Sequence, residues 1–519
     1  MREPNDLAKQ FALELRFIRK LQQDDATKMQ AAEMLHVSTT GAIITGLYEN
    51  IRKASEDTEK NLILTRAIKR FFKRFYLAPN AAIKSIGEEL VIELTLAGYL
   101  KNDSVPLETV ENINKIAHDY SLARKKLMAK FPHETVESWV LEPMSVAIGM
   151  QLVDYRINTA FVDFTYNYFL KSIDVANLFA NNPIASYEAA LFMAVQKALL
   201  NSDSASVRFS LISRYQISPL KTVDFAKVNT QIDQILASSN FDKLSHIIDR
   251  NGAPFRILEQ KLTDENLPDA LESEKSFRGI FNKATTESYI SIKKDINRGI
   301  VRSVVLISVA RLLVFLATEV PYNLINYNSS RWLPLIVNLC SPTVYMFALR
   351  FTLAMPGPNN SRSLDKEITR ILFDPVPSKP FIGSGAKRKF SPIYGIVYTI
   401  VILAILSGII YCLLTFVRFT WLDVVKLAFF LSTASFLGFR LSRNIRNIET
   451  GEESQNGLTI VRDFFYMPFV VVGRKINEIY SKFNIVSKLL DMLIELPLKT
   501  LLGVIRRWGS FISYKKDSF

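Results

Sequence analysis

The chain has very little of the chemistry that cysteine and histidine supply. Two cysteines and four histidines occur among its 519 residues. Cys340 and Cys412 both lie in apolar segments, so their number excludes a disulfide framework and we expect small buried hydrophobes. The histidines are scattered without metal-ligand spacing. We therefore expect no metal and no cofactor.

Sequence motifs of the common enzyme classes are absent as well. The chain contains no P-loop, no GxGxxG, no GxSxG and no HExxH pattern. The Gly-Ser-Gly sequence that ends at Gly385 lies beside Lys387 and reads as a loop, without a following helix to form a phosphate cradle. We name no catalytic residue, and the sequence favours a protein that is not an enzyme.

A local absence is more informative, because residues 391–417 form a run of 27 residues without one charged side chain. A helix of about 20 apolar residues crosses the roughly 30 Å hydrocarbon core of a bilayer. The run therefore predicts a membrane protein. The amino terminus is polar and lacks the apolar core of a secretory signal, so we expect residues 1–298 to stay on the side where they are synthesised.

Apolar residues in the first 298 positions recur mostly at spacings of three and four, which predicts amphipathic helices. No repeat of 30–45 residues is present. The expected fold is mainly α, with a helical cytoplasmic domain over 1–298, a four-helix transmembrane domain over 299–445, and a linker with amphipathic helices over 446–519. The expected spans are Val301–Leu324, Trp332–Met355, Ile393–Val417 and Phe419–Phe439. Expected helices of the first domain include 57–77, 81–102, 106–130, 135–172, 186–201, 224–238 and 274–298, together with a block that starts near Ser38.

Basic residues flank the expected spans unevenly. The 356–390 connection holds seven basic residues against three acidic ones, whereas each short loop on the other side holds one arginine. By the positive-inside rule, both termini and the 356–390 connection face the cytoplasm. We expect a multi-pass protein of the cell membrane.

The net charge of +14 is also uneven. Residues 1–298 hold 38 Lys and Arg against 37 Asp and Glu, while residues 299–519 hold 26 against 13. A nucleic-acid partner would require a basic soluble region. We therefore predict no nucleic-acid binding, and we expect the basic half to meet anionic lipid headgroups.

Several charged residues fall inside the expected spans. Arg311 lies near the middle of the first span and Glu319 toward its outer end, while Asp423 and Lys426 lie in the fourth. A charge at that depth is costly and needs a partner or water. One interpretation is an ion or substrate pathway lined by these residues. The other is structural: an Arg–Asp pair between two helices, with Asp423 and Lys426 neutralising each other at i, i+3.

The carboxy-terminal region combines apolar and basic residues. FFYMPFVVVG (464–473) is too short to cross, so we expect it to dip into the interface or to pack on the spans. An apolar stripe over 476–493 and a shorter helix after Pro497 are typical of in-plane membrane helices. The alternative is docking on the cytoplasmic domain. The expected membrane-interface residues are Lys475, Lys482, Lys488, Arg506, Arg507 and Trp508.

One segment of the first domain, AIKRFFKRFY (67–76), combines a basic face with an aromatic face. Lys69, Arg70, Lys73 and Arg74 are candidates for binding an acidic partner or a lipid headgroup. The alternative is an ordinary helix that buries its aromatic side chains and solvates its charges.

Three functional hypotheses follow. The first is a membrane-anchored scaffold or adaptor that binds or self-associates through its helical domain, because over half of the chain is soluble. The second is a transporter or channel that uses Arg311, Glu319 and Asp423. The third is a lipid-modifying enzyme, which the missing acid–base residues disfavour.

Overall fold

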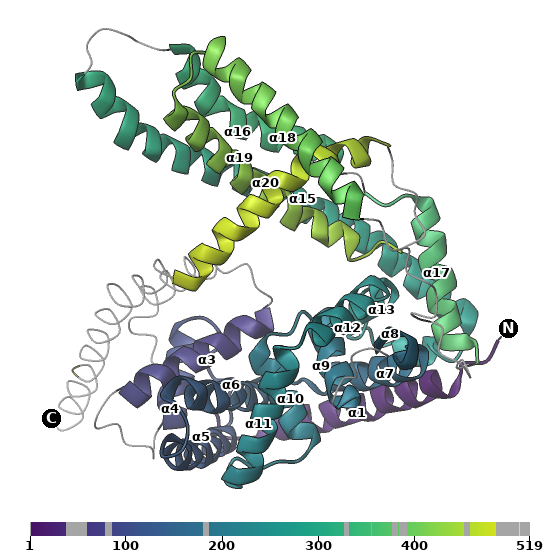
Figure 1. Cartoon of the computed structure of the whole chain (residues 1–519). Helices are drawn as coiled ribbons and strands as arrows, with labels where there is room; N and C mark the ends of the chain where they lie inside the picture. Colours follow the sequence, from purple (N-terminus) through teal and green to yellow (C-terminus); the bar gives the residue numbers. More distant parts are fainter. Residues whose placement is uncertain are drawn as a thin grey trace. The chain divides into compact units, whose positions relative to one another are not determined.

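A computed structural model describes residues 2–37, 60–77, 86–179, 186–325, 332–353, 355–375, 382, 392–450, 457–483 and 508 (Figure 1). These residues are mainly helical, which confirms that part of the expected fold class, and they contain isolated β-bridges but no strand. The expected helix near Ser38 lies outside them.

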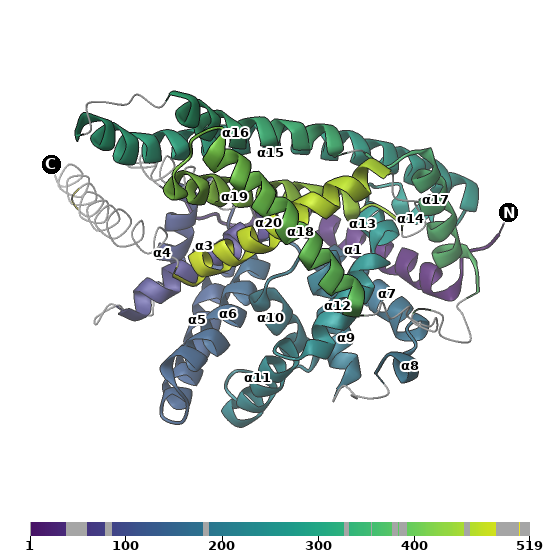
Figure 2. The same cartoon turned by 45° about the horizontal axis from the view of Figure 1, so that its top comes forward.

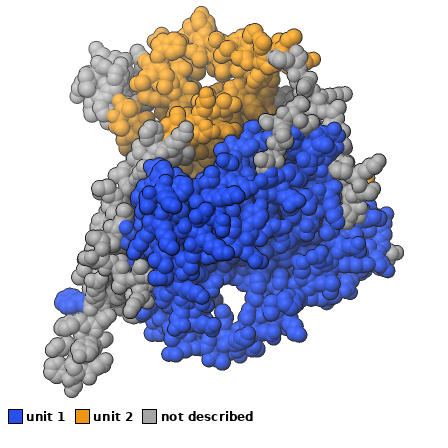
Figure 3. Space-filling view, turned by 60° about the horizontal axis from the view of Figure 1, so that its bottom comes forward, with its two compact units in different colours: residues 1–280, 367–384, 500–519 blue, residues 281–366, 385–499 orange. Residues whose placement is uncertain are grey.

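Contacts divide the chain into two compact units, coloured blue and orange in Figure 3. Unit 1 comprises residues 1–280, 367–384 and 500–519, and unit 2 comprises residues 281–366 and 385–499. The helices that lie wholly in unit 1 are α1 (Asp6–Ala31), α3 (Lys60–Leu77), α4 (Ile86–Leu96), α5 (Leu107–Met128), α6 (His133–Leu152), α7 (Arg156–Ser172), α8 (Val175–Phe179), α9 (Tyr187–Leu199), α10 (Ser204–Arg214), α11 (Thr222–Leu236), α12 (Ser239–Arg250), α13 (Ala253–Glu259) and α14 (Leu267–Ala270). Unit 2 contains α16 (Trp332–Thr352), α18 (Pro392–Thr415), α19 (Trp421–Arg446) and α20 (Gly457–Phe483), and the division falls within α15 (Glu274–Ile325) and α17 (Pro358–Phe373).

Helix α6 is the centre of one half of unit 1. Its residues 139–146 are all buried, and Val136, Val140 and Met144 are fully buried. Helices α3, α5 and α10 pack around it. Apolar burial of this extent stabilises the fold by about 1.5–3 kcal/mol for each large side chain.

The other half of unit 1 packs α1 against α7, α7 against α9, and α9 against α12. Aromatic rings fill this core: Phe11 stacks on Phe164 with ring centroids 4.7 Å apart, and Phe255 contacts Phe169 at 5.3 Å. Helix α9 lies between α7 and α12, which explains its continuous apolar sequence. A helix that is buried on both sides has no solvent-exposed face, so it needs no polar stripe.

The expectation of one helix over 135–172 is wrong. The structure breaks it into α6 and α7, with Val153 in extended conformation. The Asp154 carboxylate accepts hydrogen bonds from the backbone N–H and the side chain of Arg156, each at 2.9 Å. A local side-chain bond of this kind competes with helix continuation.

Unit 2 holds the helices that suit a bilayer. Three helices of the described chain are long and apolar enough to cross one, over Glu274–Thr318, Ile393–Thr415 and Trp421–Arg446. The helix expected over 274–298 and the span expected from Val301 form a single helix, α15. Helix α16 has 21 residues and includes Pro342. The four-span count stays a prediction.

Helices α15, α16 and α19 pack together in both views (Figures 1 and 2). One stripe of α15, which includes Ile300 and Ile307, is buried, whereas Leu306 and Leu313 are more than 60% exposed. Large exposed aliphatic side chains on one face and a packed opposite face are the pattern expected of a helix with lipid on one side.

Helices α18 and α19 form a tight hairpin. Helix α18 ends at Thr415, the Phe419 amide bonds back to the Leu413 carbonyl at 3.1 Å, and Arg418 adopts a left-handed conformation with φ 58°. This backbone pattern is a common way of ending a helix, and it turns the chain directly into α19.

Helix α20 is one continuous helix of 27 residues, which joins the apolar segment 464–473 to the first part of the stripe expected over 476–493. It packs along α19 through Tyr466 and Val470, which are both buried. Gly473 allows the closest approach, because a Cβ atom there would lie 2.8 Å from Cβ of Phe436. The apolar segment 464–473 therefore packs on α19, which is one of the expected spans.

Candidate functional site

Most of the basic side chains of α3 form ion pairs or hydrogen bonds with other residues of unit 1. Lys69 pairs with Glu142 at 3.1 Å, Arg74 pairs with Glu93, and Arg70 donates to the Tyr99 hydroxyl at 3.4 Å. Lys73 is exposed. On the opposite face Ile68 and Phe72 are fully buried. This arrangement leaves little of the basic face oriented for an external partner.

The sequence interpretation missed a buried charge network centred on Arg208, whose side chain is 4% exposed. Its guanidinium contacts Glu142 at 3.2 Å, Asn229 Oδ1 at 2.8 Å and Asp233 at 2.6 Å. The Trp139 indole donates to the second Asp233 oxygen at 2.7 Å. The network links α6, α10 and α11 through paired charges, which is the arrangement of a structural ion-pair network. A charged residue inside an apolar run, such as Glu142 in VLEPM, was the available signal.

Arg311 is buried, at 2% exposure, on α15. Its guanidinium lies over the Phe430 ring of α19, 5.1 Å from the centroid. Such cation–π contacts are stronger where the cation is desolvated. Glu319 follows on the same helix about two turns later.

Asp423 occupies the first turn of α19. Its carboxylate accepts a hydrogen bond from the Thr420 amide at 3.0 Å, and its own amide donates to the Thr420 hydroxyl at 3.3 Å, which together form a capping box. It also lies 3.8 Å from Lys426. Phe430 follows seven residues later, about 10 Å along the helix. The structure therefore brings Asp423 and Lys426 together, and it places the Arg311 contact further along α19.

The carboxy-terminal candidates are only partly described. Lys475 is exposed on α20, Lys482 lies in the same helix, and Trp508 is 66% exposed. Lys488, Arg506 and Arg507 lie outside the described residues. Within the described ranges, no three His, Cys, Asp or Glu side chains are grouped as metal ligands.

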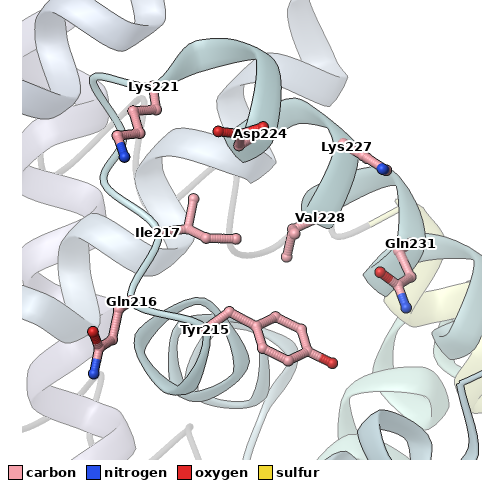
Figure 4. Close-up of a pocket in the computed structure, with 8 residues that line it drawn as sticks. All are labelled: Tyr215, Gln216, Ile217, Lys221, Asp224, Lys227, Val228 and Gln231. Carbon is pink, nitrogen blue, oxygen red and sulfur yellow. The ribbon is translucent and has the colours of Figure 1, made fainter.

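A surface hollow of about 430 Å³ opens where α10 leads into α11. Ile217 and Val228 point into its centre, and the Tyr215 ring lies along one side (Figure 4). Leu220 and Val223, 43% and 75% exposed, belong to the same stretch of chain. The remaining lining is polar: Gln216, Lys221, Asp224, Lys227 and Gln231.

A second pocket of about 260 Å³ lies among α3, α6, α7, α9 and α10. Val162 and Phe192 contribute apolar surface, and Gln196 contributes an amide. Arg214 lies over the Phe192 ring at 4.5 Å and pairs with Asp163 at 2.9 Å. No residue of either pocket belongs to the candidate set derived from the sequence. Both pockets are formed by residues of separate helices or a connecting turn, which periodicity does not reveal.

No protein-family model matches this chain, and no curated protein or solved structure matches it.

Proposed function

We propose that this protein is a membrane-anchored adaptor whose unit 1 binds another protein at the cytoplasmic surface. The supporting observation is the hollow of Figure 4, which Tyr215 lines and which has Ile217 and Val228 at its centre. Tyr215 is 44% exposed, and Leu220 and Val223, which are adjacent in sequence to the lining residues Lys221 and Asp224, are 43% and 75% exposed. Single exposed apolar residues are normal, but a group beside a hollow is typical of interaction sites.

The lining defines the chemistry of the partner. An apolar side chain fits between Ile217 and Val228, while Lys221 and Lys227 favour acidic groups beside it. Asp224 offsets one of these two positive charges. The proposed occupant is therefore a protein segment with an apolar anchor and flanking Asp or Glu residues. Opposite charges at the rim would chiefly increase the association rate and the specificity.

The membrane half serves as the anchor in this proposal. It has four spans with both termini inside, and its basic tail contacts anionic lipid. Asp423 has its hydrogen bonds at the start of α19, and Arg311 contacts an aromatic ring, which supports a structural role for these charges. Transport is the second candidate, because an arginine buried at membrane depth is costly. It fails if Arg311→Leu and Asp423→Leu leave expression and phenotype intact, an outcome that would also contradict the structural role.

Site-specific photo-crosslinking of the full chain in cells tests the adaptor role. A benzoylphenylalanine at position 223 should capture a discrete protein, and the same probe at Leu13, 62% exposed on α1, should not. Adding Lys221→Glu and Lys227→Glu should reduce the yield at 223 at least fivefold. Equal capture at both positions, or a yield indifferent to the lysines, would contradict the proposal.

A further inference from the structure

The second pocket is chemically distinct from the hollow of Figure 4. Its volume of about 260 Å³ lies just below the roughly 300–1,000 Å³ of sites for drug-sized ligands. This size suits one inserted apolar side chain with its adjoining backbone better than a complete cofactor.

Gln196 places a polar side chain in the lining of this pocket. The residue is 5% exposed overall. Its backbone carbonyl accepts from the amides of Leu200 and Ser202. Its side-chain amide is not among the buried polar groups of the described residues that lack a partner, so it stays accessible to solvent in the pocket. An amide offers two donors and an acceptor, which a matching ligand bonds in place of water.

The hydroxyl groups of the lining are oriented as acceptors. Thr159 donates its proton to the Tyr155 carbonyl at 3.1 Å, and Ser210 donates to the Ser206 carbonyl at 2.8 Å. Each hydroxyl has one proton, so the lone pairs of both oxygens stay available to a ligand. The pocket therefore favours a ligand that brings N–H donors together with a carbonyl for the Gln196 amide.

We propose that this pocket binds a short peptide segment of a partner protein. The peptide places one apolar side chain against Val162 and Phe192, and its backbone N–H and C=O pair with the Gln196 amide. A primary amide and a peptide group are complementary, because each presents one donor beside one acceptor. This proposal rests on the proposed adaptor role but assigns a site separate from the Figure 4 hollow.

Matched small probes test the assignment with the full chain in lipid nanodiscs. N-methyl-4-methylpentanamide has a single peptide group beside an isobutyl chain, and methyl 4-methylpentanoate, its ester, lacks the N–H. Titration calorimetry should show the amide binding at least tenfold more tightly than the ester. Gln196→Met, which keeps the side-chain length, should abolish this preference, whereas Gln231→Met in the other hollow should preserve it.

Ser210→Ala provides a second variant if Gln196→Met does not fold, and it should weaken amide binding at least threefold. Equal affinity of the wild type for amide and ester, or binding of neither probe, would overturn the peptide assignment. The two proposals fail separately. Loss of capture at position 223 with a retained amide preference contradicts only the docking surface, and the reverse result contradicts only the peptide pocket.

Discussion

At the scale of single residues, Arg208 joins three helices of unit 1 through buried contacts. Removing it leaves Glu142 with Lys69 and leaves the partly exposed Asp233 with Trp139. We expect Arg208→Met to lower the free energy of unfolding by about 1–3 kcal/mol. Urea unfolding followed by Trp139 fluorescence measures this, because that indole bonds to Asp233 and is the one tryptophan of residues 1–298.

Arg16→Met provides the matched control for Arg208. Arg16 also pairs with two carboxylates, at 2.8 Å and 2.7 Å, but its side chain is 39% exposed. Exposed pairs contribute about 0–1 kcal/mol. Comparable losses in the two variants would show that burial does not determine the strength of these pairs.

Asp154 gives a pH-dependent prediction. Burial raises the pKa of its carboxyl group, but hydrogen bonds from Arg156 and Gln22 outweigh burial and lower the pKa from 3.8 to about 2. A depressed pKa stabilises the folded state above pH 3.8, and this contribution is lost as the pH falls toward 2. Asp154→Asn should therefore be less stable than the wild type at pH 6.

The stability gap between the wild type and Asp154→Asn should shrink steadily from about pH 5 downward. Urea midpoints of both proteins at pH 6, 5, 4 and 3 measure it. A gap that stays constant over this range would show that the carboxylate has the same pKa in the folded and unfolded chains.

At the scale of helices, the contact between α19 and α20 depends on Gly473. A methyl group there would meet the Ser432 carbonyl and Cβ of Phe436, and a backbone atom cannot rotate away. We expect Gly473→Ala to lower stability by about 1–3 kcal/mol through overpacking. Thermal unfolding in detergent, together with protease accessibility at Arg474, detects the displaced helix.

Gly408 is the control for Gly473, because a Cβ atom at this position of α18 would have no other atom within 4 Å. Replacing a helical glycine in open space with alanine should be neutral or stabilise by about 0.5–1 kcal/mol. If both variants lose stability equally, the close approach of α20 to α19 at Gly473 does not explain the loss.

The helices were predictable where apolar residues recur every three or four positions, as in α5 and α11. Sequence periodicity failed where a specific local contact intervened. Asp154 breaks the expected 135–172 helix, and the short α10 and α12 were overlooked. Continuity was also missed, since α15 and α20 each join two segments that differ in polarity. Periodicity shows which face of a helix is apolar. It does not show whether a polar segment and an apolar segment belong to the same helix.

At the scale of the whole molecule, composition predicted the helical class and helices that are long and apolar enough to cross a membrane. The charge-free run over 391–417 was sufficient for that, because few soluble folds bury so long an apolar helix. The two pockets could not be predicted from the sequence. Their walls combine residues far apart in sequence, such as Val162 and Ser210 of the second pocket, and only tertiary packing brings these together.

The topology is the prediction that concerns the complete chain. Three helices of the described chain qualify as spans by length and composition, and four spans place both termini inside. In a cysteine-free background, Lys275→Cys and Lys366→Cys should react with an impermeant maleimide only after the cells are permeabilised. Arg418→Cys, in the hairpin between α18 and α19, should react in intact cells. If Lys366→Cys and Arg418→Cys react on the same side, α18 does not cross. Labelling of Lys275→Cys in intact cells would place unit 1 outside and remove the basis of the adaptor proposal.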